Sequence, residues 1–274
     1  MDLRGKKLNK YRFSQPNLQN IIMDSTTKND DGTSTDEDPV QFDISPSHYN
    51  GVHADLSGAD LATADLSMFI LDGVLYDENT KLPTTLTAQQ KNSMIRIATP
   101  GMDLSGQDLD FYYFKGKNIS GIIMNDKTTF TKTVDFSDAN ATKAIFTQMN
   151  FSNQTAIFRG TTLVEADMSW GDYSGDDLSS IKAQGAKMTS SNFIATNFKN
   201  AQLQNVIMLT SYWDIYSFPT DCTNADFSDA DLTGADLTGA DVTGAIFTGA
   251  KYNANTKLPA TMTPAQKASM VLVK

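Results

Sequence analysis

The sequence predicts an all-β solenoid, a fold in which successive turns of the chain stack on one another. The segment ADFSDADLTGADLTGADVTGAIFTGAKY, Ala225–Tyr252, has an aliphatic or aromatic residue at every fifth position and an alanine two positions before each one. This spacing matches neither the period of an α-helix nor the alternation of a strand. Two inward residues in every five positions suit a chain that turns after each short extended segment and so forms a solenoid.

The five-residue register can be followed along most of the chain, in roughly 37 pentads. Each pentad has a central apolar residue, called i below, with a small residue at i−2 and a polar residue at i−1. The central residues form runs from Leu3 to Met23, Leu56 to Tyr76, Leu104 to Met124, Phe136 to Phe151, Phe158 to Trp213 and Phe227 to Tyr252. A two-residue shift precedes Phe158. We therefore expect one solenoid over residues 1–274.

These pentads resemble the pentapeptide repeat family, whose pattern is A-[DN]-[LF]-x-x. The segments ADLSGADLATADL and ADFSDADLTGADL match this pattern closely, and the resemblance covers about two-thirds of the chain. It implies a right-handed quadrilateral β-helix with four pentads in each coil, and hence about nine coils here.

Four pentads per coil would stack residues that are 20 positions apart. The predicted structural core is Phe158, Leu163, Met168, Tyr173, Leu178, Met188, Phe193, Phe198, Leu203, Met208, Trp213, Phe227, Leu232 and Leu237. Within it, Tyr173, Phe193 and Trp213 form a predicted aromatic ladder. Small i−2 residues accompany this ladder, beginning with Gly171, because close packing requires large and small side chains to compensate. Asp176 also occupies an i−2 position, so it must either turn outward or find a partner.

One long segment occurs twice. YDENTKLPTTLTAQQKNSM, Tyr76–Met94, recurs 176 residues later as YNANTKLPATMTPAQKASM, Tyr252–Met270. The two copies suggest a duplicated terminating module, and MNDKTTF, which begins at Met124, is a weaker copy that places Thr128 where Thr80 and Thr256 stand.

Each copy contains a helix-start signal. Thr87–Gln90 and Thr263–Gln266 have the spacing of a capping box. We expect short helices near 88–98 and 264–272, within a helical insertion at 79–101 and a C-terminal helical cap at 255–274. These modules either cover the exposed edges of the solenoid or provide a docking surface. The apolar C-terminal residues MVLVK suit a homodimer contact.

Residues 24–53 interrupt the repeats. They include NDDGTSTDEDP, which is acidic and rich in turn-forming residues, so an acidic loop insertion is expected. The loop is either simply solvated or an arm that binds a partner.

The composition excludes several classes of protein. The formal net charge of −10 argues against direct binding of nucleic acid. No apolar run approaches the length of a membrane span, and the first residues do not form a secretory signal. A cytoplasmic protein is therefore expected. The single cysteine, Cys222, excludes an internal disulfide and a thiolate metal cluster.

The sequence contains no convincing catalytic group, so we expect neither an enzyme nor a cofactor. The abundant aspartates at i−1, such as Asp60 and Asp65, should point outward and accept hydrogen bonds from turn amides. The histidines, His48 and His53, lie in the acidic insertion, and no phosphate-binding loop is present.

Three functions remain open. The first is a non-enzymatic scaffold that binds an unidentified protein. The resemblance implies a second, a DNA-mimicking binder of DNA gyrase or topoisomerase IV that gives quinolone resistance. Stacking weakens it, because Asp167 lies under Lys187 and Asp172 under Asn192, so acidic residues form belts rather than rows. The third is a bacterial effector that is secreted without a cleavable signal.

Overall fold

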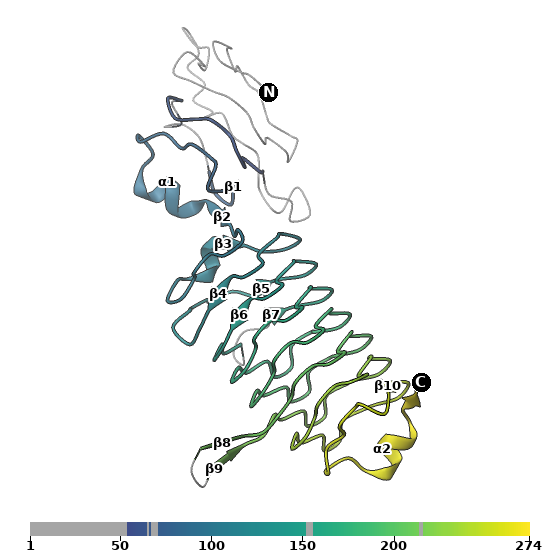
Figure 1. Cartoon of the computed structure of the whole chain (residues 1–274). Coiled ribbons are helices and arrows are strands. Elements are labelled where there is room, and N and C mark those ends of the chain that lie inside the picture. Colours follow the sequence, from purple (N-terminus) through teal and green to yellow (C-terminus); the bar gives the residue numbers. More distant parts are fainter. Residues whose placement is uncertain (1–53, 65, 67–70, 152–155, 214–215) are drawn as a thin grey trace. The chain divides into compact units, whose positions relative to one another are not determined.

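The computed structural model describes residues 54–64, 66, 71–151, 156–213 and 216–274 (Figure 1). Contacts divide the chain into two units, one of Met1–Ile97 with Phe111–Tyr113 and the other of Ala98–Asp110 with Phe114–Lys274. The predicted acidic loop at 24–53 and the run from Leu3 to Met23 lie outside the described residues. No helix among the described residues has the length and apolarity needed to cross a membrane.

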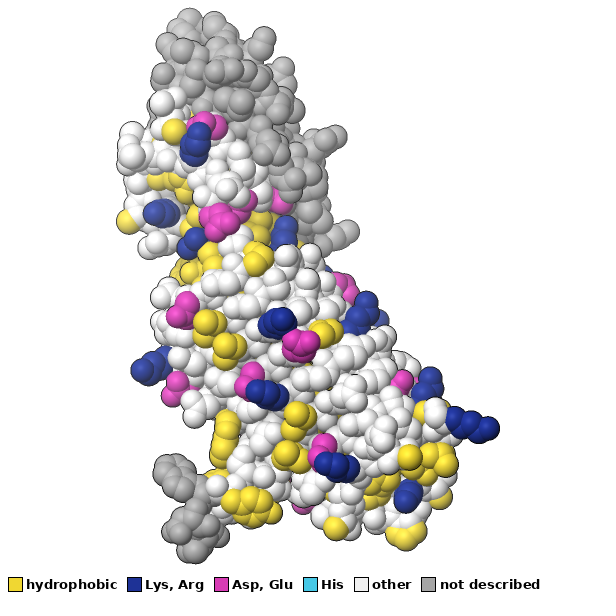
Figure 2. Space-filling view, in the orientation of Figure 1, with side chains coloured by type: hydrophobic (Ala, Val, Ile, Leu, Met, Phe, Trp, Pro, Cys, Tyr) yellow, Lys and Arg dark blue, Asp and Glu magenta, His cyan; other side chains and the backbone are white. Residues whose placement is uncertain are grey.

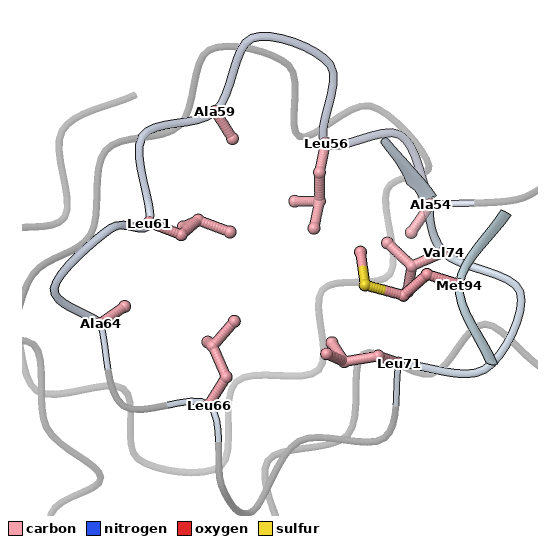
Figure 3. Close-up of a cluster of buried hydrophobic side chains, with 9 residues drawn as sticks. All are labelled: Ala54, Leu56, Ala59, Leu61, Ala64, Leu66, Leu71, Val74 and Met94. Carbon is pink, nitrogen blue, oxygen red and sulfur yellow. The ribbon is translucent and has the colours of Figure 1, made fainter. Parts of the chain in front are cut away.

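The first unit contains a three-stranded parallel sheet. Its strands, in spatial order, are β1 (Leu75–Tyr76), β2 (Ile95–Ile97) and β3 (Tyr112–Tyr113), and helix α1 (Ala88–Ser93) connects β1 to β2. A 3₁₀ helix, η1 (Leu109–Phe111), precedes β3. The described segments surround a cluster of inward-pointing side chains (Figure 3): Ala54, Leu56, Ala59, Leu61, Ala64, Leu66, Leu71, Val74 and Met94. Small and large residues alternate in this cluster as the pentads predict.

The second unit contains short paired strands and a second helix. The parallel pairs are β4 (Ile123–Met124) with β6 (Ile145–Phe146), β5 (Val134–Asp135) with β7 (Ala156–Ile157), and β10 (Lys251–Tyr252) with β11 (Val271–Leu272). The antiparallel pair is β8 (Ser211–Trp213) with β9 (Tyr216–Phe218). Helix α2 (Pro264–Ala268) lies between β10 and β11.

Most of the second unit is held by parallel bridges between i−1 residues of successive turns of the chain, and these bridges form four columns. The first column is Asp167, Lys187, Ile207, Asp236 and Lys257; the second is Asn150, Asp172, Asn192, Asp221 and Asp241; the third is Ile157, Asp177, Asn197, Asp226 and Ile246; the fourth is Thr162, Lys182, Gln202, Asp231 and Lys251. The stacking of residues 20 apart is therefore confirmed over the longest run. Bridged residues lie 22 apart where the chain passes the two-residue shift, as between Asn150 and Asp172.

The core of the second unit lies inside these columns. Of the predicted core residues, all except Trp213 are fully buried: Phe158, Leu163, Met168, Tyr173, Leu178, Met188, Phe193, Phe198, Leu203, Met208, Phe227, Leu232 and Leu237. Aromatic rings of successive turns stack face to face, with centroids of Phe198 and Phe227 5.0 Å apart and those of Tyr173 and Phe193 5.3 Å apart. Burial of such rings dominates core energetics.

Buried hydroxyl groups at i−2 are paired with the backbone of the preceding turn. The Oγ1 atoms of Thr161 and Thr196 each donate to a carbonyl oxygen at 2.7 Å, of Phe136 and Tyr173 respectively. An unpaired buried hydroxyl would be costly, so these bonds explain why threonine is tolerated in the core.

Asp176 turns inward and finds one partner. Its side chain is 1% exposed, and its Oδ1 accepts a hydrogen bond from the backbone N–H of Ala156 at 2.9 Å. Ala156 is the first described residue after the two-residue shift, so the carboxylate pairs a backbone group at the point where the repeat is interrupted. Its Oδ2 is buried without a hydrogen-bond partner. Burial raises the pKa of Asp176 to about 7, and the nearby charge of Asp172 raises it further against the bond from Ala156.

The predicted place of Trp213 in the aromatic ladder is wrong. Trp213 belongs to β8 and pairs with Tyr216 of β9, whereas Asn192 bridges Asp221, 29 residues further along the chain. Phe193 donates its backbone N–H to Asp221, so the buried Cys222 takes the next place in this ladder. The spacing of five continued into an inserted hairpin by coincidence, and periodicity alone offered no warning.

The two helices begin where the capping boxes predict. Thr87 and Thr263 each accept a hydrogen bond at the side chain from the N–H of the glutamine three residues on, and each glutamine side chain bonds back. The glutamines also tie the helices to the repeats, because Gln90 donates to Leu66 O at 2.9 Å and Gln266 to Val242 O at 2.8 Å. Both helices end earlier than predicted, since the chain must extend to form β2 and β11.

The duplicated segments make the same contacts. Thr80, Thr128 and Thr256 each donate from Oγ1 to a carbonyl oxygen 24 residues earlier, at 3.0, 3.1 and 2.9 Å. The interpretation of the module as a terminator is nevertheless wrong for the first copy. There β2 pairs on its far side with β3, so another turn of chain follows the helix.

Candidate protein-interaction site

The described residues offer no group of three or more histidine, cysteine or acidic side chains that could hold a metal ion. His48 and His53 lie outside the described part of the chain. Cys222 is buried in the core, and burial raises the pKa of its thiol, with the charges of Asp221 and Asp241 acting in the same direction. A protonated, buried thiol is a poor nucleophile.

The outward aspartates close the turns of the repeats. Oδ1 of Asp172, Asp221 and Asp241 accepts the N–H two residues on, at 3.1, 2.9 and 2.9 Å. Asn192 accepts the same bond, from Ile194 at 3.1 Å. The predicted capping role is therefore confirmed, and it requires a side-chain oxygen but no charge. Asp60 instead binds Lys81 Nζ at 2.8 Å, and Asp65 lies outside the described residues.

The most distinctive surface feature is the hairpin β8–β9, which leaves the repeats between the first and second columns (Figure 1). Tyr212 is 77% exposed, Tyr216 65% and Phe218 39%. Exposed rings of this size are uncommon on a surface that only faces water, whereas aromatic residues are enriched at the centres of protein interfaces. We call Trp170, Tyr212, Tyr216 and Phe218 the aromatic corner. Figure 2 shows hydrophobic side chains gathered at the base of the hairpin.

The base of the hairpin is fixed to the repeats by Ser190. Its Oγ donates to Phe218 O at 2.7 Å and accepts from the N–H of Ser211 at 3.1 Å. The N–H of Ser190 donates to Thr220 Oγ1 at 3.0 Å, at the point where the chain re-enters the core. The hairpin is therefore held at both ends by one turn of the array.

Trp170 extends the aromatic corner onto the repeats themselves. Its ring centroid lies 5.5 Å from that of Phe218, and the side chain remains 44% exposed. Its φ is 63°, in the left-handed region that glycine occupies at the equivalent Gly239. A bulky residue is uncommon there, and such outliers concentrate at functional sites.

Charge is unevenly distributed over the four columns. The first column contains Lys187 and Lys257 and the fourth contains Lys182 and Lys251, whereas the second and third, as defined above, contain no lysine or arginine. Asp236 is paired with Lys257 at 2.7 Å. No cation pairs with Asp172, Asp221 or Asp241 among the residues that the structure describes. Hydrogen bonds from Thr243 hold the pKa of Asp241 below its usual range.

The expectation that acidic residues form belts holds in part. Asp167 bridges Lys187 and Asp172 bridges Asn192, as predicted. The inserted hairpin changes the register above them, however, and places Asp221 directly under Asp241. The second column consequently carries aspartate at three of its five positions, next to the aromatic corner.

Comparison with known proteins identifies the repeats. A family model described as pentapeptide repeats matches eight copies over residues 134–172, 177–208 and 220–251. The second stretch ends before the hairpin and the third begins immediately after it, so the hairpin is an addition to the repeats. The chain belongs to the pentapeptide repeat family. Proteins of this family fold as right-handed quadrilateral β-helices and are generally non-catalytic structural or binding proteins.

Solved pentapeptide repeat structures resemble the chain at low identity. Full-length QnrB1, a plasmid-mediated fluoroquinolone resistance protein, is 17% identical, with 65% of this chain and 92% of QnrB1 covered and a TM-score of 0.36. HetL, from the cyanobacterium Nostoc and involved in heterocyst differentiation regulation, is 19% identical over 91% and 88%, with a TM-score of 0.29. A thylakoid lumen protein of Arabidopsis thaliana is 17% identical over 57% and 74%, with a TM-score of 0.33. No curated protein matches the sequence.

Proposed function

We propose that the chain is a right-handed quadrilateral β-helix of about nine coils that acts as a non-enzymatic scaffold and binds another protein through the aromatic corner. The exposed hairpin carries this proposal. Three aromatic side chains that are 39% to 77% exposed bring large apolar area to one place, and such residues commonly dominate binding energy when a partner covers them. The bonds of Ser190 support the proposal, because a surface held in place loses little conformational freedom on binding.

Deletion of residues 211–219 provides the test. Because the bridged residues Asn192 and Asp221 are 29 apart, removal of nine residues restores the spacing of 20 and joins Thr210 directly to Thr220. A photo-crosslinking residue at the exposed Lys182 of the fourth column, away from the hairpin, would report partners held elsewhere, and one at Tyr212 would report partners of the corner. In extracts of the source cells we expect a discrete crosslinked protein from position 212 but not from 182. Pull-down with the deletion variant should lose that protein; its retention would contradict the proposal.

We also propose a contact between two copies of the chain at the C-terminal strand. Val271 and Leu272 of β11 are 47% and 66% exposed, and within the described residues no strand pairs with the outer edge of β11. The equivalent edge of β2 is covered by β3. An uncovered apolar edge favours association. Sedimentation should show a dimer that Leu272→Glu dissociates; a monomer at every concentration of the wild-type protein would contradict this contact.

A further inference from the structure

The aromatic corner and the second column form one continuous surface. Only Pro219 and Thr220 separate Phe218 of the corner from Asp221 of the column, and Asp221 bridges Asp241 above and Asn192 below. Trp170 at the corner is two residues before Asp172 of the same column. Exposed rings therefore lie beside three carboxylates that have no cationic partner among the described residues.

This combination selects the chemistry of a ligand. Asp172, Asp221 and Asp241 each use Oδ1 to close a turn, and no printed hydrogen bond engages their Oδ2 atoms. Isolated aromatic patches favour apolar partners, and isolated carboxylates attract any cation. A guanidinium group satisfies both, because it stacks on aromatic faces and binds carboxylates through a fork of N–H donors. The net charge of −10 opposes nucleic acids and anionic membranes.

We propose that this surface binds an arginine-bearing, cationic segment of the partner protein. The inference rests on the proposed function and specifies the chemistry of the partner. Guanidinium groups stack on the rings of Tyr212 and Tyr216, and neighbouring arginines pair with the carboxylates of Asp221 and Asp241. The adjacent third column, which also has no cation, extends the favourable potential to a longer segment.

The experiment measures the affinity of the full chain for a fluorescent nine-residue oligo-arginine peptide and for its oligo-lysine counterpart, at about physiological salt. Two test variants are Tyr212→Ala with Tyr216→Ala, and Asp221→Asn with Asp241→Asn. The control is Asp231→Asn with Asp236→Asn, which removes the same charge from the fourth and first columns. Asparagine keeps the turn closed, as Asn192 does. We expect oligo-arginine to bind more tightly than oligo-lysine, each test variant to weaken it about tenfold, and the control to change it less than about threefold.

Three results would overturn the inference: no binding of oligo-arginine, equal weakening by the control variant, or equal affinities for the two peptides with no effect of the tyrosine replacements. The last two would mean that only net charge is recognised. Failure here is distinguishable from failure of the proposed function. If the crosslinked protein disappears when residues 211–219 are deleted but oligo-arginine neither binds nor competes with it, the corner binds a partner of other chemistry.

Discussion

Replacing Asp176 by asparagine should make the protein more stable above neutral pH. The carboxyl group is buried with one oxygen unpaired, and burial raises its pKa from 3.8 to about 7. In the folded state it therefore holds a proton that the unfolded chain has released. The difference corresponds to about 4 kcal/mol. Asparagine retains the oxygen that accepts from Ala156 and carries no charge.

The sign of this effect fixes the pH window. Between about pH 4 and pH 7 the folded state binds more protons than the unfolded state, so the contribution of Asp176 to stability falls as pH rises. The free energy of unfolding of Asp176→Asn minus that of the wild type should therefore increase across this window and level off above it. Asp177→Asn, which changes an outward-facing neighbour, is the control. A pH-independent difference for Asp176→Asn would contradict the account of a buried, protonated carboxyl.

Replacing Gly171 by alanine should destabilise the core by about 1–3 kcal/mol because the site has no room for a methyl group. A Cβ there would lie 2.8 Å from Cζ of Tyr173 and 2.9 Å from its hydroxyl oxygen. The tyrosine cannot easily move, since it is fully buried and its hydroxyl donates to Phe146 O at 3.1 Å. The φ of Gly171 lies outside the left-handed region, so the expected effect arises from packing.

A double-mutant cycle isolates that cause. Tyr173→Leu removes the atoms that the new methyl group would meet, so the Gly171→Ala change should cost less in the Tyr173→Leu background than in the wild type. Urea unfolding of the four proteins measures the coupling, expected in the range of about 0.5–3 kcal/mol. Additive costs would show that the glycine is required for some reason other than the tyrosine ring.

The repeats made much of the fold predictable. An inward residue at i, a small residue at i−2 and a capping oxygen at i−1 are local requirements of each pentad, so Phe158, Leu178 and Phe198 could be assigned to the core from their spacing. The capping boxes at Thr87 and Thr263 were predictable for the same reason, because they depend on residues only three positions apart.

The candidate site could not be predicted in the same way. Trp213 falls in register with Phe193, and an apolar residue in register carries no sign that the chain has left the array. The available signals were weaker: YWDIYSFPT lacks a small residue at i−2, and Pro219 suits the edge of a sheet. Pairing of Asp221 with Asp241 depends in turn on the length of the inserted hairpin.

The central claim is that residues 211–219 are a binding hairpin added to an array that folds without them. The most direct measurement is the free energy of unfolding of the chain from which these nine residues are deleted. We predict a cooperative transition within about 1 kcal/mol of the wild type, because Thr220 and Cys222 continue the core at the restored spacing. A loss of several kcal/mol, or loss of the cooperative transition, would show that the segment containing Trp213 is part of the core and would contradict the account.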